Sequence, residues 1–374
     1  MTAQRHAAFT LVEMLVSTAV VLLLISIMIA AVSQVSSVWQ RAVAKGEQFR
    51  EARDGFDGMT TRLAQATLDV HWEYDNPALP TKYRRDSNLR FISGPANQLI
   101  GAPTGGRAWP THAVFFEAPL GLSENTAHRG FENLMCTCGY YLEVGDDSRL
   151  RPAFLPASKV PVRVRPRLME MWHPTERNTI YQLTGGTMGA TYVGRDWFCG
   201  PLGGTTPPVH VLAENIVALI ITPRLAPADE AEVLGSSATA NPDFSPLAPA
   251  YLYDSSPVTA ANRGDSRYLD GRLNPVHQLP PMLQVSMVVV DEKSISRLGY
   301  STAQLDPLSL AGKPSKPAKF QNTGSYSKDM LVTGGAESVE TQLIARHLNY
   351  RIFTSNVVIR AAKWSREQTE TLPP

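Results

Sequence analysis

The chain opens with a hydrophobic segment whose one acidic residue stands at its start. Residues Met14 to Val32 are 19 consecutive positions without a charged side chain, which is long enough for an α-helix to cross the hydrocarbon core of a bilayer. Glu13 immediately precedes this run. A carboxylate costs about 2.5 to 3.5 kcal/mol at the centre of a membrane helix and less toward the interface, so Glu13 requires either headgroup solvation or a cationic partner. The pattern predicts a single membrane-spanning helix over residues 9–32.

Helical periodicity continues through residues 33–72. Apolar side chains recur every seven residues, and smaller ones fall three positions after the first three of them: Phe49, Phe56, Leu63 and Val70, with Ala52, Met59 and Ala66. A stripe of this kind on an otherwise charged helix indicates one packed face. We predict an amphipathic stalk helix that runs to about Val70, with the stripe against a sheet of the same chain. Because the pattern continues past Ala30 and Ala31, a secreted protein with a cleaved signal peptide is the less favoured interpretation.

From residue 73 to residue 374 the sequence predicts a β-rich domain. Its candidate strands are short segments with alternating or β-branched residues: Ala113 to Ala118, Tyr140 to Val144, Arg167 to Trp172, Ile216 to Thr222, Leu283 to Asp291 and Asn356 to Ala361. Pro- and Gly-rich connectors separate them, without the amphipathic helices that parallel strands need. The predicted fold class is therefore α+β, with the long N-terminal helix packed on an antiparallel sheet.

Two connectors are too long for ordinary turns. Residues 225–275 are rich in Ala, Pro, Ser, Asn and Asp, and residues 307–335 include the sequence GKPSKPAK. Segments of this length are either loop insertions that face a partner or mobile segments. A short helix is predicted after them, over residues Glu337 to Tyr350.

Composition excludes several functions. The 374 residues include 35 basic and 34 acidic side chains, for a net charge of +1. This balance, without a run of Lys and Arg, gives no reason to expect nucleic acid as a partner. The sequence has no GxSxG elbow, HExxH helix, P-loop or GxGxxG followed by a helix, so no catalytic residue is predicted and we expect the protein not to be an enzyme.

The three cysteines and the acidic pairs are the remaining candidates for covalent or metal chemistry. In an oxidising compartment, one disulfide could join Cys199 to either Cys136 or Cys138 and leave the third thiol unpaired. The eight histidines are scattered singly, so no metal site is predicted. Adjacent acids such as Asp146 and Asp147 could bind calcium only if further oxygens converged on them. No cofactor is expected.

The start of the chain resembles the N-terminal signature of type IV prepilins and type II secretion pseudopilins. The resemblance rests on a short leader with Arg5, then FTLVE at residues 9–13, followed directly by the apolar run. It implies a leader of residues 1–8, cleavage between Ala8 and Phe9 by a prepilin peptidase, and N-methylation of Phe9. The family nearly always has glycine where this chain has Ala8. The resemblance further implies that Glu13 pairs with the amino terminus of a neighbouring subunit during filament assembly.

A looser resemblance covers the C-terminal half. The order VHVLAENIVALIITPRL, QLPPMLQVSMVVVDE and a terminal strand resembles minor pseudopilin J of type II secretion. Four further segments are similar to the prepilin-like family called Verru/Chthon cassette protein C: CGYYLEVGDDSRLRPAFLP, LMEMWHPTERNTIY, LAPAYLYDS and LNYRIFTSNVVIRAAKW.

These resemblances imply a pilin-like structural subunit of a type II secretion or type IV pilus-like filament. Its implied partners are other pseudopilins, the prepilin peptidase, the inner-membrane assembly platform and the lipid bilayer. Its implied location is the inner membrane, spanned once, with the N terminus in the cytoplasm and the C-terminal domain in the periplasm. The alternative is a surface adhesin or ligand-binding minor pilin, and a membrane-tethered hydrolase is a third hypothesis.

Overall fold

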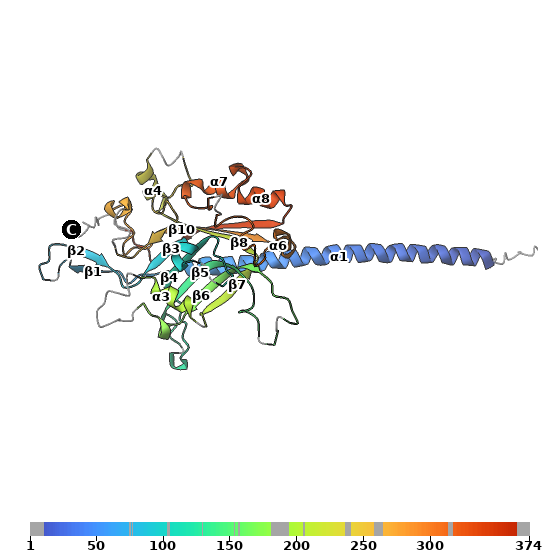
Figure 1. Cartoon of the computed structure of the whole chain (residues 1–374), viewed down its shortest axis with the longest axis horizontal. Coiled ribbons are helices and arrows are strands. Elements are labelled where there is room, and N and C mark those ends of the chain that lie inside the picture. Colours follow the sequence, from blue (N-terminus) through green and yellow to red (C-terminus); the bar gives the residue numbers. More distant parts are fainter. Residues whose placement is uncertain are drawn as a thin grey trace, which may run out of the picture. The chain divides into compact units, whose positions relative to one another are not determined.

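The computed structural model describes residues 11–74, 76, 78–102, 105–128, 130–152, 154–155, 158–180, 194–204, 206–235, 241–257, 265–312 and 317–364. The chain forms two compact units, Met1–Arg50 and Glu51–Pro374. Helix α1 (Leu11–Leu63) has 53 residues, so it supplies the described part of the first unit and the beginning of the second (Figure 1). The fold is α+β, with an apolar N-terminal helix and antiparallel sheets.

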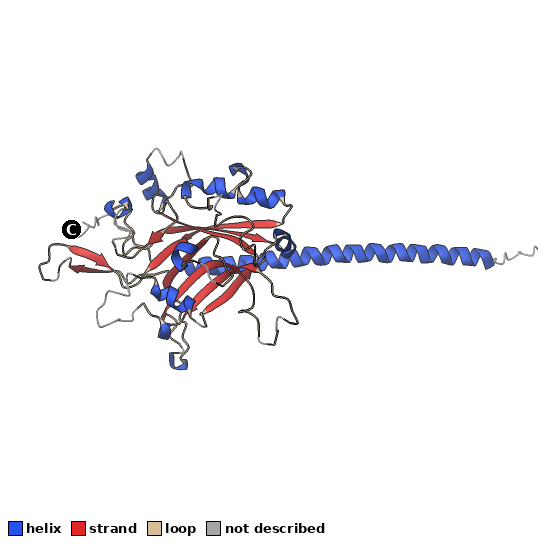
Figure 2. Ribbon diagram, viewed as in Figure 1, coloured by secondary structure: helices blue, strands red, loops and turns tan. Residues whose placement is uncertain are grey.

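The larger sheet of the second unit has six antiparallel strands in the order β7-β6-β5-β4-β3-β9 (Figure 2). The strands are β3 (Phe91–Pro95), β4 (His112–Pro119), β5 (Met135–Gly145), β6 (Arg165–His173), β7 (Val209–Glu214) and β9 (Tyr253–Asp254). β4 is buried over nearly its whole length, which explains why its sequence reads as a continuous apolar run.

One face of this sheet is covered by the short helices α2 (Ala96–Ile100) and α3 (Asp196–Gly203). Phe198 of α3 stacks on Phe115 of β4 with ring centroids 4.0 Å apart. Gly139 lies opposite Phe115 in the neighbouring strand β5. A Cβ atom on Gly139 would lie 2.2 Å from Cδ1 of Phe115, so the absence of a side chain at this position makes room for the ring.

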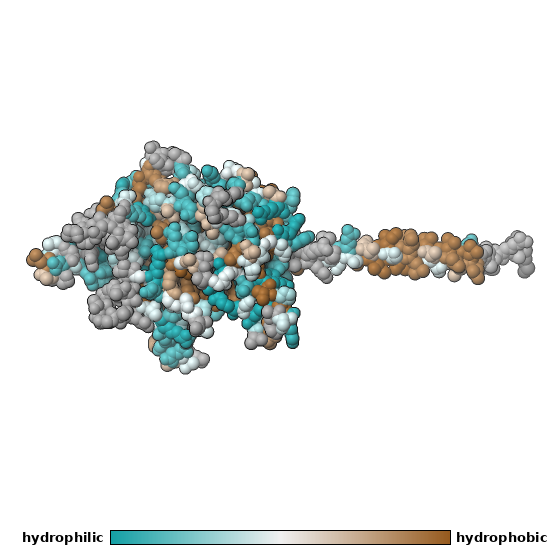
Figure 3. Space-filling model, in the orientation of Figure 1, coloured by the Kyte–Doolittle hydropathy of each residue, from teal (hydrophilic) through white to brown (hydrophobic). Residues whose placement is uncertain are grey.

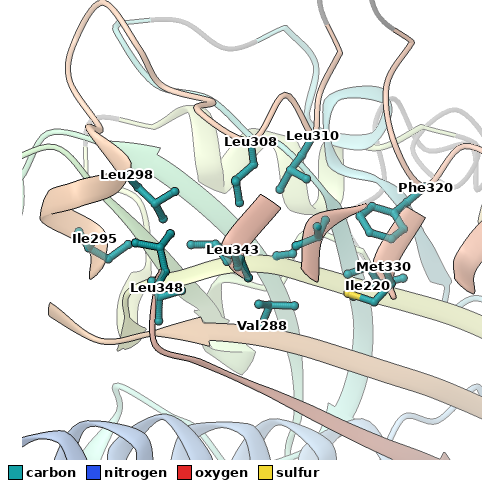
Figure 4. Packing of buried hydrophobic residues seen from close by; sticks show 14 of the residues in the cluster. Ile220, Val288, Ile295, Leu298, Leu308, Leu310, Phe320, Met330, Leu343 and Leu348 are labelled. Atoms are coloured by element: carbon teal, nitrogen blue, oxygen red, sulfur yellow. The ribbon is translucent and has the colours of Figure 1, made fainter. Parts of the chain in front are cut away.

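The smaller sheet has three antiparallel strands in the order β11-β10-β8: β8 (Ile216–Arg224), β10 (Met282–Val290) and β11 (Tyr350–Val358). Its outer face carries α6 (Glu292–Leu298), α7 (Tyr326–Met330) and α8 (Val339–Ala345). Figure 4 shows the apolar core between them, where Val288 of the sheet lies among Leu343, Leu348 and Met330.

The two sheets meet through His112, a fully buried residue of β4. Its Nδ1 accepts a hydrogen bond of 3.1 Å from the backbone N–H of Ile221 in β8. Its Nε2 lies 3.3 Å from the carbonyl oxygen of Phe320, which can only accept, so Nε2 carries the proton. His112 is therefore neutral, and its burial lowers its pKa to about 4.

A separate two-stranded hairpin consists of β1 (His71–Tyr74) and β2 (Tyr83–Asp86). The carboxylate of Asp69 fixes its base by accepting hydrogen bonds from the Ser87 hydroxyl, the backbone N–H groups of Asn88 and Leu89, and the Asn88 amide, at 2.8 to 2.9 Å. Burial alone would raise the pKa of Asp69, but these hydrogen bonds outweigh burial and lower the pKa.

Four of the six predicted strands coincide with β4, β6, β8 and β10 to within two residues, and the predicted strand Tyr140 to Val144 covers only the second half of β5. The sixth prediction, Asn356 to Ala361, has the wrong bounds, because β11 begins at Tyr350 to pair with the whole of β10. The predicted helix over Glu337 to Tyr350 is α8, which is shorter. The predicted loop over residues 225–275 contains α4 (Pro227–Leu234) and β9, and the loop over residues 307–335 contains α7.

Helix α1 ends at Leu63, seven residues before the predicted end. After Leu63, backbone groups form hydrogen bonds to distant parts of the chain and not to the next helical turn. The Thr67 N–H donates to the Glu117 carbonyl, and the Ala64 carbonyl accepts from the Arg360 N–H. Val70 therefore lies beyond the helix, with 46% of its surface exposed, and is not part of the packed stripe. The second compact unit begins at Glu51, inside the segment predicted as a stalk over residues 33–72.

Candidate functional site

The first part of α1 has the length and composition of a membrane span. Residues Leu11–Ser36 form 26 residues of helix with a mean hydropathy of 2.8, and none of this segment is buried by the chain itself. Figure 3 shows the continuous run of apolar residues along it. Burying an apolar side chain contributes about 1.5 to 3 kcal/mol, so this exposed segment would be stabilised by lipid or by other protein. Of the described residues, this is the one helix that meets the criteria for a span.

Two hydroxyl side chains inside this segment form hydrogen bonds within the helix. The Ser17 hydroxyl donates to the Met14 carbonyl and the Thr18 hydroxyl to the Leu15 carbonyl, each at 3.0 Å. Hydroxyls that bond within their own helix need no water. Glu13 lies in the first turn of the described helix. Ala8 and Phe9, the predicted cleavage and methylation positions, lie outside the described residues.

The last turns of α1 belong to the second unit, where the predicted stripe packs. Phe56, Met59 and Leu63 are 3%, 0% and 0% exposed, and the smaller Ala52 and Ala66 are also buried. Phe56 stacks on Phe353 of β11 with ring centroids 5.9 Å apart. Phe49 falls just before the boundary, in the first unit. The stripe within the second unit thus joins the helix to the last strand of the chain.

Gly55, on the same part of α1, allows a close approach to β7. A Cβ atom on Gly55 would lie 3.4 Å from the backbone oxygen of Leu212 and 3.5 Å from Cβ of Ala213. The helix therefore contacts the edge strand of the larger sheet as well as β11 of the smaller one.

A polar cluster fixes the end of α1 to the larger sheet. Arg62 forms an ion pair with Glu170 of β6, and its Nη1 lies 3.5 Å from the hydroxyl of Tyr140 in β5. The Tyr140 hydroxyl donates to Oε1 of Glu170 at 2.6 Å. The Arg62 guanidinium also lies over the Trp172 ring, 4.6 Å from its centroid, at cation–π distance. We call these four residues the Arg62 clamp.

Burial and charge act in opposite directions on the clamp. Desolvation alone would lower the pKa of Arg62, but its hydrogen bond to Tyr140 and the nearby Glu170 charge outweigh desolvation and raise the pKa. Burial, with smaller effects of Cys138 and Glu170, raises the pKa of Tyr140. Tyr140 therefore remains a hydrogen-bond donor and Arg62 a cation, which is what the acceptor Glu170 requires.

The three cysteines lie on opposite sides of the larger sheet. Successive side chains of a strand point to opposite faces of the sheet, so Cys136, Cys138 and Tyr140 of β5 share one face and Gly139 lies on the other. The face with Tyr140 is the one against which α1 packs. Cys199 belongs to α3, which covers the other face. All three thiols are free in the structure, and the intervening sheet explains why neither predicted pairing forms. Burial raises the pKa of each thiol.

One surface cluster contains the residue types of a catalytic triad. The hydroxyl of Ser123 lies 3.2 Å from Nδ1 of His128, and the same Nδ1 lies 2.9 Å from Oε1 of Glu176. In a triad the serine and the acid contact different nitrogens of the imidazole, whereas here Ser123 donates directly to Glu176. This hydrogen bond, with backbone donors, lowers the pKa of Glu176 to about 2. The arrangement suits an anionic loop anchor better than a nucleophile.

A second cluster, on the β1–β2 hairpin, was not apparent from the sequence. His71, Glu73 and Asp86 place one imidazole nitrogen and two carboxylate oxygens within 4.8 Å of one another. The sequence signal was the alternation His-Trp-Glu at residues 71–73, which puts the first and third side chains on one face of a strand. Asp86 joins them because the hairpin register pairs it with His71. Asp146, considered above for calcium, is not part of this cluster.

The opposite face of the same hairpin is aromatic. Trp72, Tyr74 and Tyr83 are 56%, 48% and 63% exposed, and the two tyrosine rings stack with centroids 5.1 Å apart. Exposed aromatic side chains that cluster on one element are typical of contact surfaces.

Comparison of the chain with protein-family models, with curated proteins and with solved structures gave no match.

Proposed function

We propose that the protein is a membrane-inserted, prepilin-like structural subunit of a type II secretion or type IV pilus-like filament. The observation that carries the proposal is helix α1 itself. An exposed apolar segment, Leu11–Ser36, is continuous in one helix with a segment that packs into a β-rich domain. The FTLVE signature at its start supports the same interpretation.

In this proposal the work of the protein is mechanical. A prepilin peptidase cleaves between Ala8 and Phe9 and methylates Phe9, and the new amino terminus becomes the cationic partner of Glu13 on an adjacent subunit. In a low-dielectric setting, removing one member of a charge pair is costly because the other charge is left unpaired. The pair would therefore hold neighbouring helices in register. The Arg62 clamp would transmit force from the helix to the domain. The N terminus faces the cytoplasm, the domain faces the periplasm, and the assembly platform and sibling pseudopilins are the partners.

Two measurements test the proposal. The intact mass of the membrane form should correspond to a chain without residues Met1 to Ala8 and with one additional methyl group; a mass that includes the leader would contradict the proposal.

In a second experiment, Glu13→Ala should reduce incorporation into filaments by about tenfold or more, because one partner of the charge pair is lost. Thr18→Ala is the matched control, since its hydroxyl bonds only within the helix.

A surface adhesin or ligand-binding minor pilin is the second candidate function. The observation that favours it is the exposed aromatic face of the hairpin, formed by Trp72, Tyr74 and Tyr83. Deleting the gene separates the two functions: the filament subunit predicts a changed secreted proteome, whereas the adhesin predicts normal secretion and reduced attachment. The double variant Trp72→Ala/Tyr83→Ala should reduce attachment only if the adhesin function is correct.

A further inference from the structure

The polar face of the β1–β2 hairpin has the geometry of a metal site. His71 and Glu73 are two residues apart on β1, and Asp86 of β2 lies directly opposite His71. The three side chains therefore share one face, with their ligand atoms within 4.8 Å of one another. We propose that His71, Glu73 and Asp86 bind a divalent transition-metal ion of the zinc class.

The hydrogen bond of His71 identifies the ligand atom. Nδ1 of His71 lies 3.0 Å from the carbonyl oxygen of Asp69. A carbonyl only accepts, so Nδ1 carries the proton and Nε2 of the neutral ring presents a lone pair. Nε2 lies 3.2 Å from Oε1 of Glu73, which is also an acceptor. Nε2 therefore either donates to Glu73 as part of an imidazolium ring or, in the neutral ring, binds a cation that it shares with Glu73 and Asp86, and a metal ion fulfils that second role for all three side chains.

A second layer of hydrogen bonds orients the Asp86 carboxylate. Oδ1 of Asp86 accepts from the backbone N–H of Ser87 at 2.7 Å and lies 3.3 Å from Nε2 of His277. Arg90 can only donate, and it lies 3.3 Å from Nδ1 of His277, so Nε2 of His277 carries the proton that Asp86 accepts. His277 is 3% exposed. Buried donors that fix a carboxylate ligand, and a carbonyl that fixes the tautomer of a histidine ligand, are the usual outer shell of metal sites.

The ligand set favours zinc over calcium or magnesium. Calcium and magnesium prefer six or more oxygen ligands, whereas one imidazole with two carboxylates suits zinc and its neighbours in the first transition series. The side chains of His71 and Glu73 are 40% and 52% exposed, so ions can enter from solvent and water can complete the coordination. An isolated two-stranded hairpin is marginally stable, and an ion bound to both strands would rigidify it and the aromatic face on its other side.

The test uses the full-length chain in detergent, without a histidine tag, after removal of metals with a chelator. Zinc chloride is titrated at neutral pH by calorimetry. We expect one zinc ion per chain, with binding weakened about tenfold or more by His71→Ala and by Glu73→Gln, since each removes one ligand. His210→Ala is the control, because His210 is exposed on β7 and is not part of the cluster, and this substitution should leave the affinity unchanged. Calcium chloride in about a hundredfold excess should not displace zinc.

A second measurement distinguishes a lost ligand from a misfolded hairpin. Zinc should slow amide hydrogen exchange in peptides that cover β1 and β2 in the unmodified protein, and should leave the exchange of Glu73→Gln unchanged at the same concentration. If zinc does not bind at one ion per chain, or if His71→Ala binds it with unchanged affinity, the cluster is a histidine–carboxylate ion pair only and the proposal is wrong. Neither readout depends on filament assembly, so its outcome is independent of the proposed function.

Discussion

Replacing Arg62 with methionine tests whether the Arg62 clamp holds the end of α1 to the larger sheet. Methionine retains much of the apolar stem of Arg62 and removes its charge. The substitution leaves Glu170, whose side chain is 6% exposed, with Tyr140 as its remaining clamp donor. It also removes the cation from the face of the Trp172 ring. The helix should therefore be held less firmly, although its apolar stripe is intact.

The exposure of the two partners sets the size of the effect. Removing one member of a fully buried pair costs about 3 to 5 kcal/mol. The Arg62 side chain is 28% exposed, so solvent screens part of the interaction, and we expect Arg62→Met to lower the free energy of unfolding by about 2 to 3 kcal/mol. Glu170→Gln preserves an acceptor for Tyr140 while it removes the charge, so the double variant should be more stable than the two separate losses predict, by about 1 to 2 kcal/mol.

Urea unfolding of the full chain in detergent, followed by near-ultraviolet circular dichroism, measures these differences. Arg53→Met is the matched control, because Arg53 pairs with Asp57 on the same helix and their side chains are 68% and 62% exposed. A surface pair of this kind contributes at most about 0.5 kcal/mol. If Arg62→Met costs no more than Arg53→Met, or if the losses for Arg62 and Glu170 simply add, the clamp does not couple the helix to the sheet.

Two further predictions concern buried groups on β4 with opposite pH dependence. The pKa of His112 is lowered to about 4 by burial, so the stability that its neutral ring contributes is present above its ordinary value of 6.5 and is lost as pH falls toward 4. The loss is about 3 kcal/mol, and His112→Gln should flatten this part of the curve of unfolding free energy against pH. Burial raises the pKa of Glu117 to about 7, although Thr137 and Asn178 donate hydrogen bonds to it, so its protonated form favours the folded state and stability falls as pH rises from 4.5 to 7. Glu117→Gln should therefore raise the free energy of unfolding at pH 8 by up to about 3 kcal/mol, as measured by chemical denaturation; an unchanged value would contradict a buried, ionised carboxylate.

The strands that are buried along nearly their whole length could be predicted from the sequence, because burial on both faces leaves a largely apolar run. β4, β8 and β10 are of this kind. β9 has two residues, too few for any periodicity. The end of α1 could not be predicted from the stripe, since the seven-residue spacing continues to Val70. Thr67 instead donates to a carbonyl of β4, and that contact depends on the tertiary fold.

Much of the site depends on contacts between distant residues. The hydrogen-bond partners of Arg62 in the clamp are 78 and 108 positions away, so no local sequence pattern predicts them. Cys199 is separated from the other two cysteines because α3 packs on the opposite face of the sheet. The sequence does not indicate on which face α3 packs. The hairpin cluster was not predicted: alternation places His71 and Glu73 on one face of a strand, but Asp86 can be added only once the strand register is known.

The stacking of Phe56 on Phe353 has a consequence for synthesis. The ribosome makes the helix first and the last strand roughly 300 residues later, which takes about 15 to 60 s at 5 to 20 residues per second. Until β11 emerges, the apolar side of the nascent helix lacks one of its native neighbours. A chain truncated before β11 should therefore be prone to aggregation and depend on chaperones, although it contains every other strand and helix of the domain.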